Sequence, residues 1–312
     1  MGSGMWRSFL IKTGLILFFI KIKLIGLARR MRQISLLRSI WDFYVQMRTL
    51  LLRALYHNGK YVRFNGGLVF IDFYDRNYIW YYKYNEFFRQ ETEAFRTLLE
   101  KRKPKVILDI GAHWGIFPSQ LEIDESPLTS TIEKVICIEP DSSNLIKLKK
   151  TVEMIKRFKV DIVPFAISDK EDSIPMYKGT ASCLHAYKGG ASEYACTVNA
   201  APLHIILRNM GVQLGDVTHI KLDIDGYEPA FFYGSTEFLK EHKPLLLAEF
   251  WARGLIDAGF DVKEYWEYLH SMYDVTEIVY PTNEYRTLSV GDLGYIREKT
   301  LNEITNLLLI PK

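Results

Sequence analysis

Residues 106–117 read VILDIGAHWGIF, and this stretch decides the fold. An apolar run interrupted by one acid, Asp109, leads directly into two glycines, Gly111 and Gly115. The run has the length of a buried strand, and glycine after such a strand permits a tight turn. In open α/β sheets, ligands bind beyond the carboxyl ends of the strands. We therefore expect a strand ending at residue 110, followed by a glycine loop whose backbone a ligand can approach closely.

Similar apolar runs recur along the chain and alternate with helical patterns. The expected strands cover residues 105–110, 134–138, 160–166, 219–224 and 245–249, and the expected helices lie near 116–122, 144–157, 202–210, 229–241 and 263–272. Residues 275–280 and 304–310 are expected to complete the sheet as edge strands. Near-continuous apolar strands separated by helices indicate a doubly wound, mostly parallel α/β sheet, here of seven strands, with helices on both faces.

The pattern divides the chain into three parts. Residues 1–60 form a leader, residues 61–103 a connecting segment, and residues 104–312 the main domain. Within the connecting segment, residues 61–80 alternate as a β-hairpin that turns at 65–67, and residues 86–101 have the pattern of a helix.

The leader is strongly basic. It carries eleven Lys and Arg and one acid, Asp42, whereas the rest of the chain is net acidic. Its longest apolar run, residues 15–20, is far shorter than the roughly 20 residues that a membrane span needs. Residues 9–30 and 34–55 read as two basic amphipathic helices, which favours binding to an acidic membrane surface. A helical cap on the main domain and a signal-anchor remain alternatives. The aliphatic density and the lack of an aromatic-basic motif argue against nucleic acid as a partner.

A second strand ends in an acid. The run VICIEP places Glu139 at the carboxyl end of the strand over 134–138. A carboxylate only accepts hydrogen bonds, so it can accept from both hydroxyls of a ribose. The spacing Gly111-x-x-x-Gly115 lacks the third glycine of a dinucleotide site. The two loops therefore predict a nucleoside without a pyrophosphate, and we expect S-adenosylmethionine.

Five blocks in order resemble the FkbM-family methyltransferases. They are VILDIGAHWGIF (106–117), VICIEPDSSNLIKLKKTV (135–152), VPFAISDKEDSIPMY (163–177), HIKLDIDGYEPAFFYGSTEFLKEHKPLLLAEF (219–250) and TNLLLIPK (305–312). The resemblance covers about residues 86–312. It implies the class I methyltransferase fold, which is Rossmann-like, and S-adenosylmethionine-dependent O-methylation of sugar or natural-product hydroxyls.

The resemblance also implies roles for individual residues. Around the cofactor it places Asp109, Gly111, Ala112, His113, Gly115, Glu139, Pro140, Asn144, Ile167, Ser168 and Asp169, with Ala166 beside them. Beside the transferred methyl group it places the acids Asp223, Asp225, Glu228 and Glu249, together with Gly226.

Three residues depart from the family pattern. His113 stands where Asn is usual, which introduces a group that can titrate. Asp225 replaces a common Glu and is one methylene shorter. Asn199 replaces a usual Asp, so Asn199 is left out of the catalytic set.

A sugar hydroxyl is a poor nucleophile and needs a base within hydrogen-bond reach. The four acids are the candidates, and no residue is assigned to a metal, although these carboxylates could instead bind Mg²⁺. Glu228 could simply cap the helix that follows it. His185, in a glycine-rich loop with Tyr187, is a further candidate base.

The sequence thus predicts an O-methyltransferase for a small-molecule or glycan hydroxyl, including a lipid-linked saccharide, cytoplasmic and peripheral to a membrane. Two alternatives are a catalytically silent scaffold docked on a membrane and a nicotinamide-dependent oxidoreductase.

Overall fold

The computed structural model describes residues 35–75, 78, 85–178, 184–186, 193–280, 282 and 284–312. The chain divides into two compact units, Met1–His57 and Asn58–Lys312. The helix expected over residues 9–30, Tyr187 and part of the region expected to form the hairpin lie outside the described residues.

The described part of the first unit is one long helix, α2 (Ser35–Leu55). Its exposed apolar side chains recur at helical spacing, and they are Phe43, Met47, Leu50, Leu51 and Leu55. These positions share one face of the helix, and Arg48 and Arg53 flank that face. No described helix is long and apolar enough to cross a membrane.

The second unit begins with a hairpin of β1 (Lys60–Phe64) and β2 (Gly67–Ile71). The turn is the pair Asn65-Gly66, and both residues have positive φ, as the favoured two-residue hairpin turns require. The backbone N–H of Phe70 donates to Thr151 Oγ1 at 3.0 Å, which fixes the hairpin against the helix that carries Thr151.

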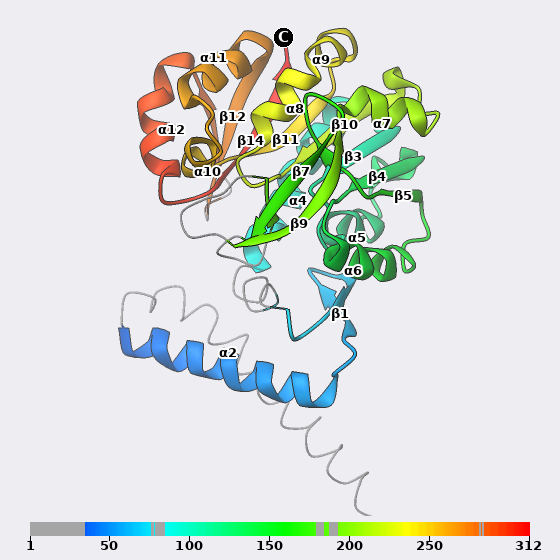
Figure 1. Ribbon diagram of the computed structural model, residues 1–312, viewed down its shortest axis with the longest axis vertical. Helices are drawn as coiled ribbons and strands as arrows, with labels where there is room; N and C mark the ends of the chain where they lie inside the picture. Colours follow the sequence, from blue (N-terminus) through cyan, green and yellow to red (C-terminus); the bar gives the residue numbers. More distant parts are fainter. Residues whose placement is uncertain are drawn as a thin grey trace, which may run out of the picture. The chain divides into compact units, whose positions relative to one another are not determined.

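The main sheet has the order β13-β12-β14-β11-β10-β3-β4-β5 (Figure 1). Its central strands are β3 (Val106–Ile110), β4 (Lys134–Ile138), β5 (Lys159–Val163), β10 (Val217–Leu222) and β11 (Leu245–Phe250), and all their pairings are parallel. The prediction of a mostly parallel, doubly wound α/β sheet is confirmed.

The far side of the sheet differs from the prediction. β14 (Thr305–Pro311) is not an edge strand, because it lies between β11 and β12 (Tyr273–Val279) and is antiparallel to both. The edge is an additional strand, β13 (Glu284–Leu288), so the sheet has eight strands instead of seven. Residues 305–309 are buried, as an interior position requires.

Helices cover both faces of this sheet. They are α4 (Asn85–Lys101), α5 (Ile116–Glu122), α6 (Ser142–Val152), α7 (Leu203–Asn209), α8 (Glu228–Gly234), α9 (Thr236–His242), α10 (Ala252–Asp257), α11 (Val262–Met272) and α12 (Leu293–Thr300), with 3₁₀ turns η1 (Thr129–Thr131), η2 (Leu214–Asp216) and η3 (Val290–Asp292). Asp141 caps α6 and Asp261 caps α11 by accepting backbone N–H groups. The single helix expected over 229–241 is two helices that meet at Ser235.

Two apolar cores lie on the two faces. Successive residues of a strand point to opposite faces, so Leu108 and Ile110 join one core while Ile107 joins the other. The second core is completed by α4, α5 and α6. Asp109 is two positions from Ile107, and it therefore points to the face that α4 covers.

A second sheet was not predicted. It contains β6 (Ala166–Ile167), β7 (Asp172–Lys178), β8 (Leu184–His185) and β9 (Tyr194–Ala201), in the order β6-β9-β7-β8. The strand expected over 160–166 ends at Val163, and Ala166 begins this smaller sheet.

Candidate functional site

The loop after β3 is held by neighbouring strands. The backbone N–H groups of Gly111 and Ala112 both donate to the carbonyl of Ile138, at 2.9 and 3.1 Å. Gly111, His113 and Gly115 all have positive φ, which costs a non-glycine residue such as His113 conformational energy. The loop is therefore a fixed turn at the carboxyl end of the sheet.

The two glycines serve the packing of the chain itself. A Cβ on Gly111 would lie 1.7 Å from the carbonyl oxygen of Asp223, and one on Gly115 would lie 2.8 Å from Leu148 Cδ1. From the sequence we attributed both glycines to a tight turn and to the close approach of a ligand. Their positive φ values confirm the turn, and the structure shows in addition that Gly111 admits the loop after β10 and that Gly115 admits helix α6.

Glu139, at the end of β4, ties this loop to the next one. Its carboxylate accepts from the backbone N–H groups of His113 (2.8 Å) and Asp141 (2.9 Å), and from Asn144 Nδ2 (3.4 Å). Burial raises the pKa of Glu139 to about 7. A carboxylate has about four acceptor positions, so three are used and one remains for a further donor.

The residues around Glu139 are fixed by their own contacts. Asn144 Oδ1 accepts from Trp114 Nε1 at 3.1 Å, and the ammonium group of Lys147 lies 5.1 Å from the centre of the Trp114 ring. Pro140 is partly buried beside them. Burial, with Lys147 and Lys221 nearby, holds the pKa of His113 well below its usual range. His113 is therefore neutral at physiological pH.

The residues expected near the adenine begin the second sheet. Ile167 pairs with Ala201, and Ile167 and Ser168 are buried, whereas Asp169 is exposed. Ser168 Oγ donates to Asp169 Oδ1 at 3.2 Å. These three residues are thus fixed by β9 and by each other.

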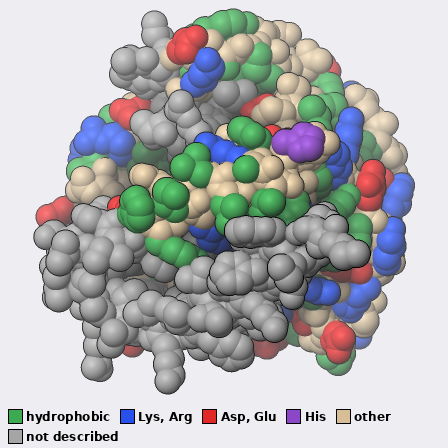
Figure 2. All heavy atoms as spheres, turned by 90° about the horizontal axis from the view of Figure 1, so that it is seen from below, with side chains coloured by type: hydrophobic (Ala, Val, Ile, Leu, Met, Phe, Trp, Pro, Cys, Tyr) green, Lys and Arg blue, Asp and Glu red, His purple; other side chains and the backbone are tan. Residues whose placement is uncertain are grey.

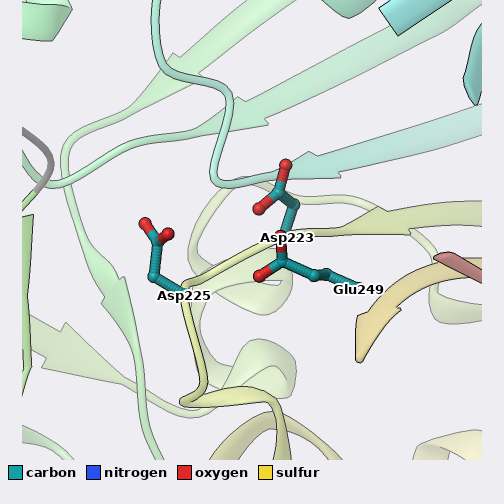
Figure 3. Close-up of side chains that lie close together, drawn as sticks. All are labelled: Asp223, Asp225 and Glu249. Atoms are coloured by element: carbon teal, nitrogen blue, oxygen red, sulfur yellow. The ribbon is translucent and has the colours of Figure 1, made fainter. Parts of the chain in front are cut away.

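Three of the four predicted catalytic acids converge. Asp223 and Asp225 follow β10, and Glu249 lies in β11; one carboxylate oxygen from each falls within 4.8 Å of the others (Figure 3). Asp225 has a φ of 55° and is followed by Gly226 at 91°, so the loop turns back sharply after β10. Burial first, and then the neighbouring Asp223, Asp225 and Glu228, raise the pKa of Glu249 well above its usual range.

Glu228 has a different task from the other three. Its Oε1 accepts from the backbone N–H groups of Ile224 (3.0 Å) and Gly226 (3.3 Å), so it holds the loop between β10 and α8. The side chain is fully buried, and burial raises its pKa to about 8. Both N–H groups belong to the loop before α8, so Glu228 braces that loop, which is a different role from the helix cap that the sequence raised.

Lys221 and Glu91 also belong to this site, and neither was predicted from the sequence. Lys221 Nζ lies 3.0 Å from Asp223, 3.7 Å from Glu91 of α4 and 3.8 Å from Asp109. Lys221 pairs directly with Asp109 across β10 and β3, which places both on the face that α4 covers. The available clue in 219–222 was that His219 and Lys221 alternate with apolar residues in an otherwise buried strand, whereas nothing local distinguished Glu91.

Asp109 is the least satisfied group of this network. It is fully buried, and neither carboxylate oxygen has a hydrogen-bond partner. Burial raises the pKa of Asp109 to about 6, although Lys221 opposes the shift. Buried polar groups are ordinarily hydrogen-bonded, so this carboxylate is suited to a cationic donor.

Two residues singled out by sequence lie elsewhere. Asn199 is exposed in β9, opposite Ser173 of β7. The backbone of His185 pairs with Tyr177 in the same sheet. The side chain of His185 is outside the described part of the structure.

The strand order and site define the class. A central parallel sheet in which the last strand inserts antiparallel beside β11, with a glycine loop after β3 and an acid after β4, is the class I methyltransferase fold.

Comparisons with known proteins give low similarities. No family model and no curated protein matches this chain. The chain is similar to the crystal structure of methyltransferase FkbM from Methylobacillus flagellatus KT, with 19% identity and a TM-score of 0.41 over 66% of this chain and 44% of that one. It is also similar to the plantazolicin methyltransferase BpumL in complex with S-adenosylhomocysteine, with 13% identity and a TM-score of 0.38 over 76% and 89% of the two chains. The chain thus spans less than half the length of the FkbM structure.

Proposed function

We propose that this chain is an S-adenosylmethionine-dependent O-methyltransferase. The observation that carries the proposal is Asp109, a fully buried carboxylate without hydrogen-bond partners at the carboxyl end of β3. The ammonium group of a methionine tail would supply the hydrogen-bond donors that this carboxylate lacks. When bound, S-adenosylmethionine would supply an electrophilic methyl group on a sulfonium.

Glu139 supports the nucleoside half of the same ligand. It stands at the neighbouring strand end, and its remaining acceptor position suits a ribose hydroxyl. Lys147 is paired with Asp75 at 2.5 Å, so this cation is already engaged within the protein. The two carboxylates therefore fit a cationic nucleoside, and this favours the methyl donor over a nicotinamide dinucleotide.

The acceptor we propose is a hydroxyl of a sugar, glycan or lipid-linked saccharide. Asp223, Asp225 and Glu249 gather at the ends of β10 and β11, on the side of the sheet where ligands bind in such folds. A carboxylate there could accept the proton of an acceptor hydroxyl. Alternatively, the carboxylates could bind a cation such as Mg²⁺, which would lower the pKa of that hydroxyl. Holding the acceptor hydroxyl in line with the methyl group would account for much of the acceleration of methyl transfer.

The lipid-linked form of the acceptor rests on the leader. Five exposed hydrophobic side chains form a stripe along α2, with arginines on either side, and Figure 2 shows exposed hydrophobic side chains next to basic ones. An amphipathic helix of this kind binds in the interface of an acidic membrane. We therefore propose a cytoplasmic enzyme attached peripherally to the membrane that contains its substrate.

Calorimetric titration with S-adenosylmethionine tests the cofactor. Binding is expected for the full chain and should be lost in Asp109→Asn, because the neutral amide no longer attracts an ammonium group. Asp216→Asn is the matched control, since Asp216 precedes β10 at the opposite end of the strand. If Asp109→Asn binds as well as the wild-type chain, the assignment is wrong. Acceptors are then screened with a labelled methyl donor.

Vesicle co-sedimentation tests the membrane. Binding to vesicles with acidic lipid is expected to be stronger than to neutral vesicles, and Leu50→Glu with Leu51→Glu should abolish it. Gln46→Glu adds a charge at an exposed position of the same helix and should weaken binding only slightly. Equal binding by all variants would contradict the proposal.

A further inference from the structure

The three converging carboxylates come from two adjacent strand ends. Figure 3 shows Asp223 and Asp225 on the loop after β10, and Glu249 extending from β11 toward them. One oxygen of each lies within 4.8 Å of the others. Like charges at this separation, partly shielded from water, repel each other, so either a proton on one carboxylate or a bound cation must relieve the repulsion.

Glu249 supplies the second observation. The residue is only 6% exposed, and its Oε2 is buried without a hydrogen-bond partner. A buried carboxylate oxygen that accepts no hydrogen bond is costly in free energy. Because the side chain extends toward Asp223 and Asp225, a ligand held by all three would satisfy this oxygen.

The nearby lysine contacts one member of the cluster and two acids outside it. Lys221 contacts Asp223 at 3.0 Å, but it is shared with Glu91 and Asp109 on the face covered by α4. Its single charge is thus divided among three acids. Glu228 lies outside the cluster, because its Oε1 holds two backbone N–H groups and neither of its oxygens is among the three that converge. A cation bound beside Glu249 Oε2 would therefore satisfy a buried oxygen that Lys221 leaves without a partner.

We propose that Asp223, Asp225 and Glu249 bind a hard divalent cation of the Mg²⁺ class. Three carboxylates, each giving one oxygen, leave the remaining positions of an octahedral ion for water and one substrate oxygen. The role of the site rests on the proposed function: the cation holds the acceptor hydroxyl and lowers its pKa, and the released proton passes to solvent.

Titration of the full chain with Mn²⁺, followed by electron paramagnetic resonance, tests the site without any methyl donor. One bound ion per chain is expected, displaced by Mg²⁺. Asp225→Asn and Glu249→Gln should each weaken binding at least ~tenfold, because one charged ligand is lost. Asparagine tolerates the positive φ of Asp225, so this variant keeps the loop. Glu237→Gln, an exposed acid on α9, is the control and should bind as the wild-type chain does.

Two outcomes overturn the inference: no stoichiometric Mn²⁺ binding, or unchanged binding in Asp225→Asn with a wild-type circular dichroism spectrum. Calorimetry with S-adenosylmethionine separates this failure from that of the proposed function. If the cofactor binds and Mn²⁺ does not, only the cation site is wrong. If Mn²⁺ binds and the cofactor does not, the site stands and its proposed role in methyl transfer is wrong.

Discussion

The carbonyl oxygen of Asp223 occupies the space that a side chain on Gly111 would need. A Cβ on Gly111 would lie 1.7 Å from that oxygen, and the backbone N–H of Asp223 donates to the carbonyl of Ile110 at 3.0 Å. The glycine loop and the acidic loop are therefore locked together by backbone contact. The positions expected to hold cofactor and acceptor are fixed relative to each other before either ligand binds.

Substituting Gly111 by alanine should disrupt this contact. The new methyl group clashes with backbone that cannot rotate away, and φ is 83°. We expect a loss of stability of more than ~3 kcal/mol, measured by urea denaturation. Gly211→Ala is the matched control, because Gly211 also has positive φ but nothing lies within 4 Å of its added Cβ. Equal losses in the two variants would show that strain in φ alone accounts for the effect.

Substituting Lys221 by methionine should leave buried acids without their cation. Burial lowers the pKa of Lys221, but Asp223, Glu91 and Asp109 together raise it above its ordinary value. Breaking a buried pair of this kind costs about 3–5 kcal/mol. The loss, read from urea denaturation, should grow as the pH rises and the acids ionise. Lys105→Met removes a solvent-exposed pair with Asp216 and should change little. Comparable losses in both would contradict the network.

Cofactor affinity should depend on pH through Glu139. Its folded-state pKa is raised to about 7, and only the ionised carboxylate is a pure acceptor for a ribose hydroxyl. Affinity for S-adenosylhomocysteine should therefore fall by up to about tenfold per pH unit below 7. The Glu139→Gln variant should bind S-adenosylhomocysteine more weakly than the wild-type chain at pH 8, and its affinity should not show the fall below pH 7. Calorimetric titrations of the wild-type chain and the variant from pH 5.5 to 8 make the comparison. If the affinities of the two proteins change in parallel with pH, Glu139 does not hold the ribose.

His219 should make the fold sensitive to acid. Burial lowers its folded-state pKa to about 4, while the unfolded chain keeps the ordinary 6.5. Between pH 4 and 6.5 the unfolded state binds more protons than the folded state. The contribution of neutral His219 to the free energy of unfolding is therefore fully present above pH 6.5 and is lost as the pH falls toward 4. The total is about 3 kcal/mol. The free energy of unfolding of His219→Gln should fall less over this range, and an identical fall would sink the prediction.

Much of the sheet could be predicted because the determining pattern is local. β3, β4 and β11 are mainly apolar runs of five or six residues, and the acids Asp109 and Glu249 stand near the carboxyl ends of their strands. Parallel strands bring their carboxyl ends to one edge, so gathering Asp223 with Glu249 needed no knowledge of long-range packing. This is why three of the four proposed catalytic acids were found together.

The remainder depends on contacts between distant segments. Glu91 joins the site only because α4 packs under β10, and Gly111 is required by a backbone more than a hundred residues away. Strand order is equally non-local, and the run over 305–311 gives no sign of an interior position. The second sheet was missed because the polar, partly exposed residues of β7 lack an apolar run.

The insertion of β14 between β11 and β12 has a consequence during translation. Residues 245–279 are synthesised before residues 305–311, so β14 cannot join β11 and β12 until the later segment is available. Until then the facing backbone edges of β11 and β12 are open, and open edges invite association with other chains. A chaperone that binds the nascent chain would protect these edges during this interval.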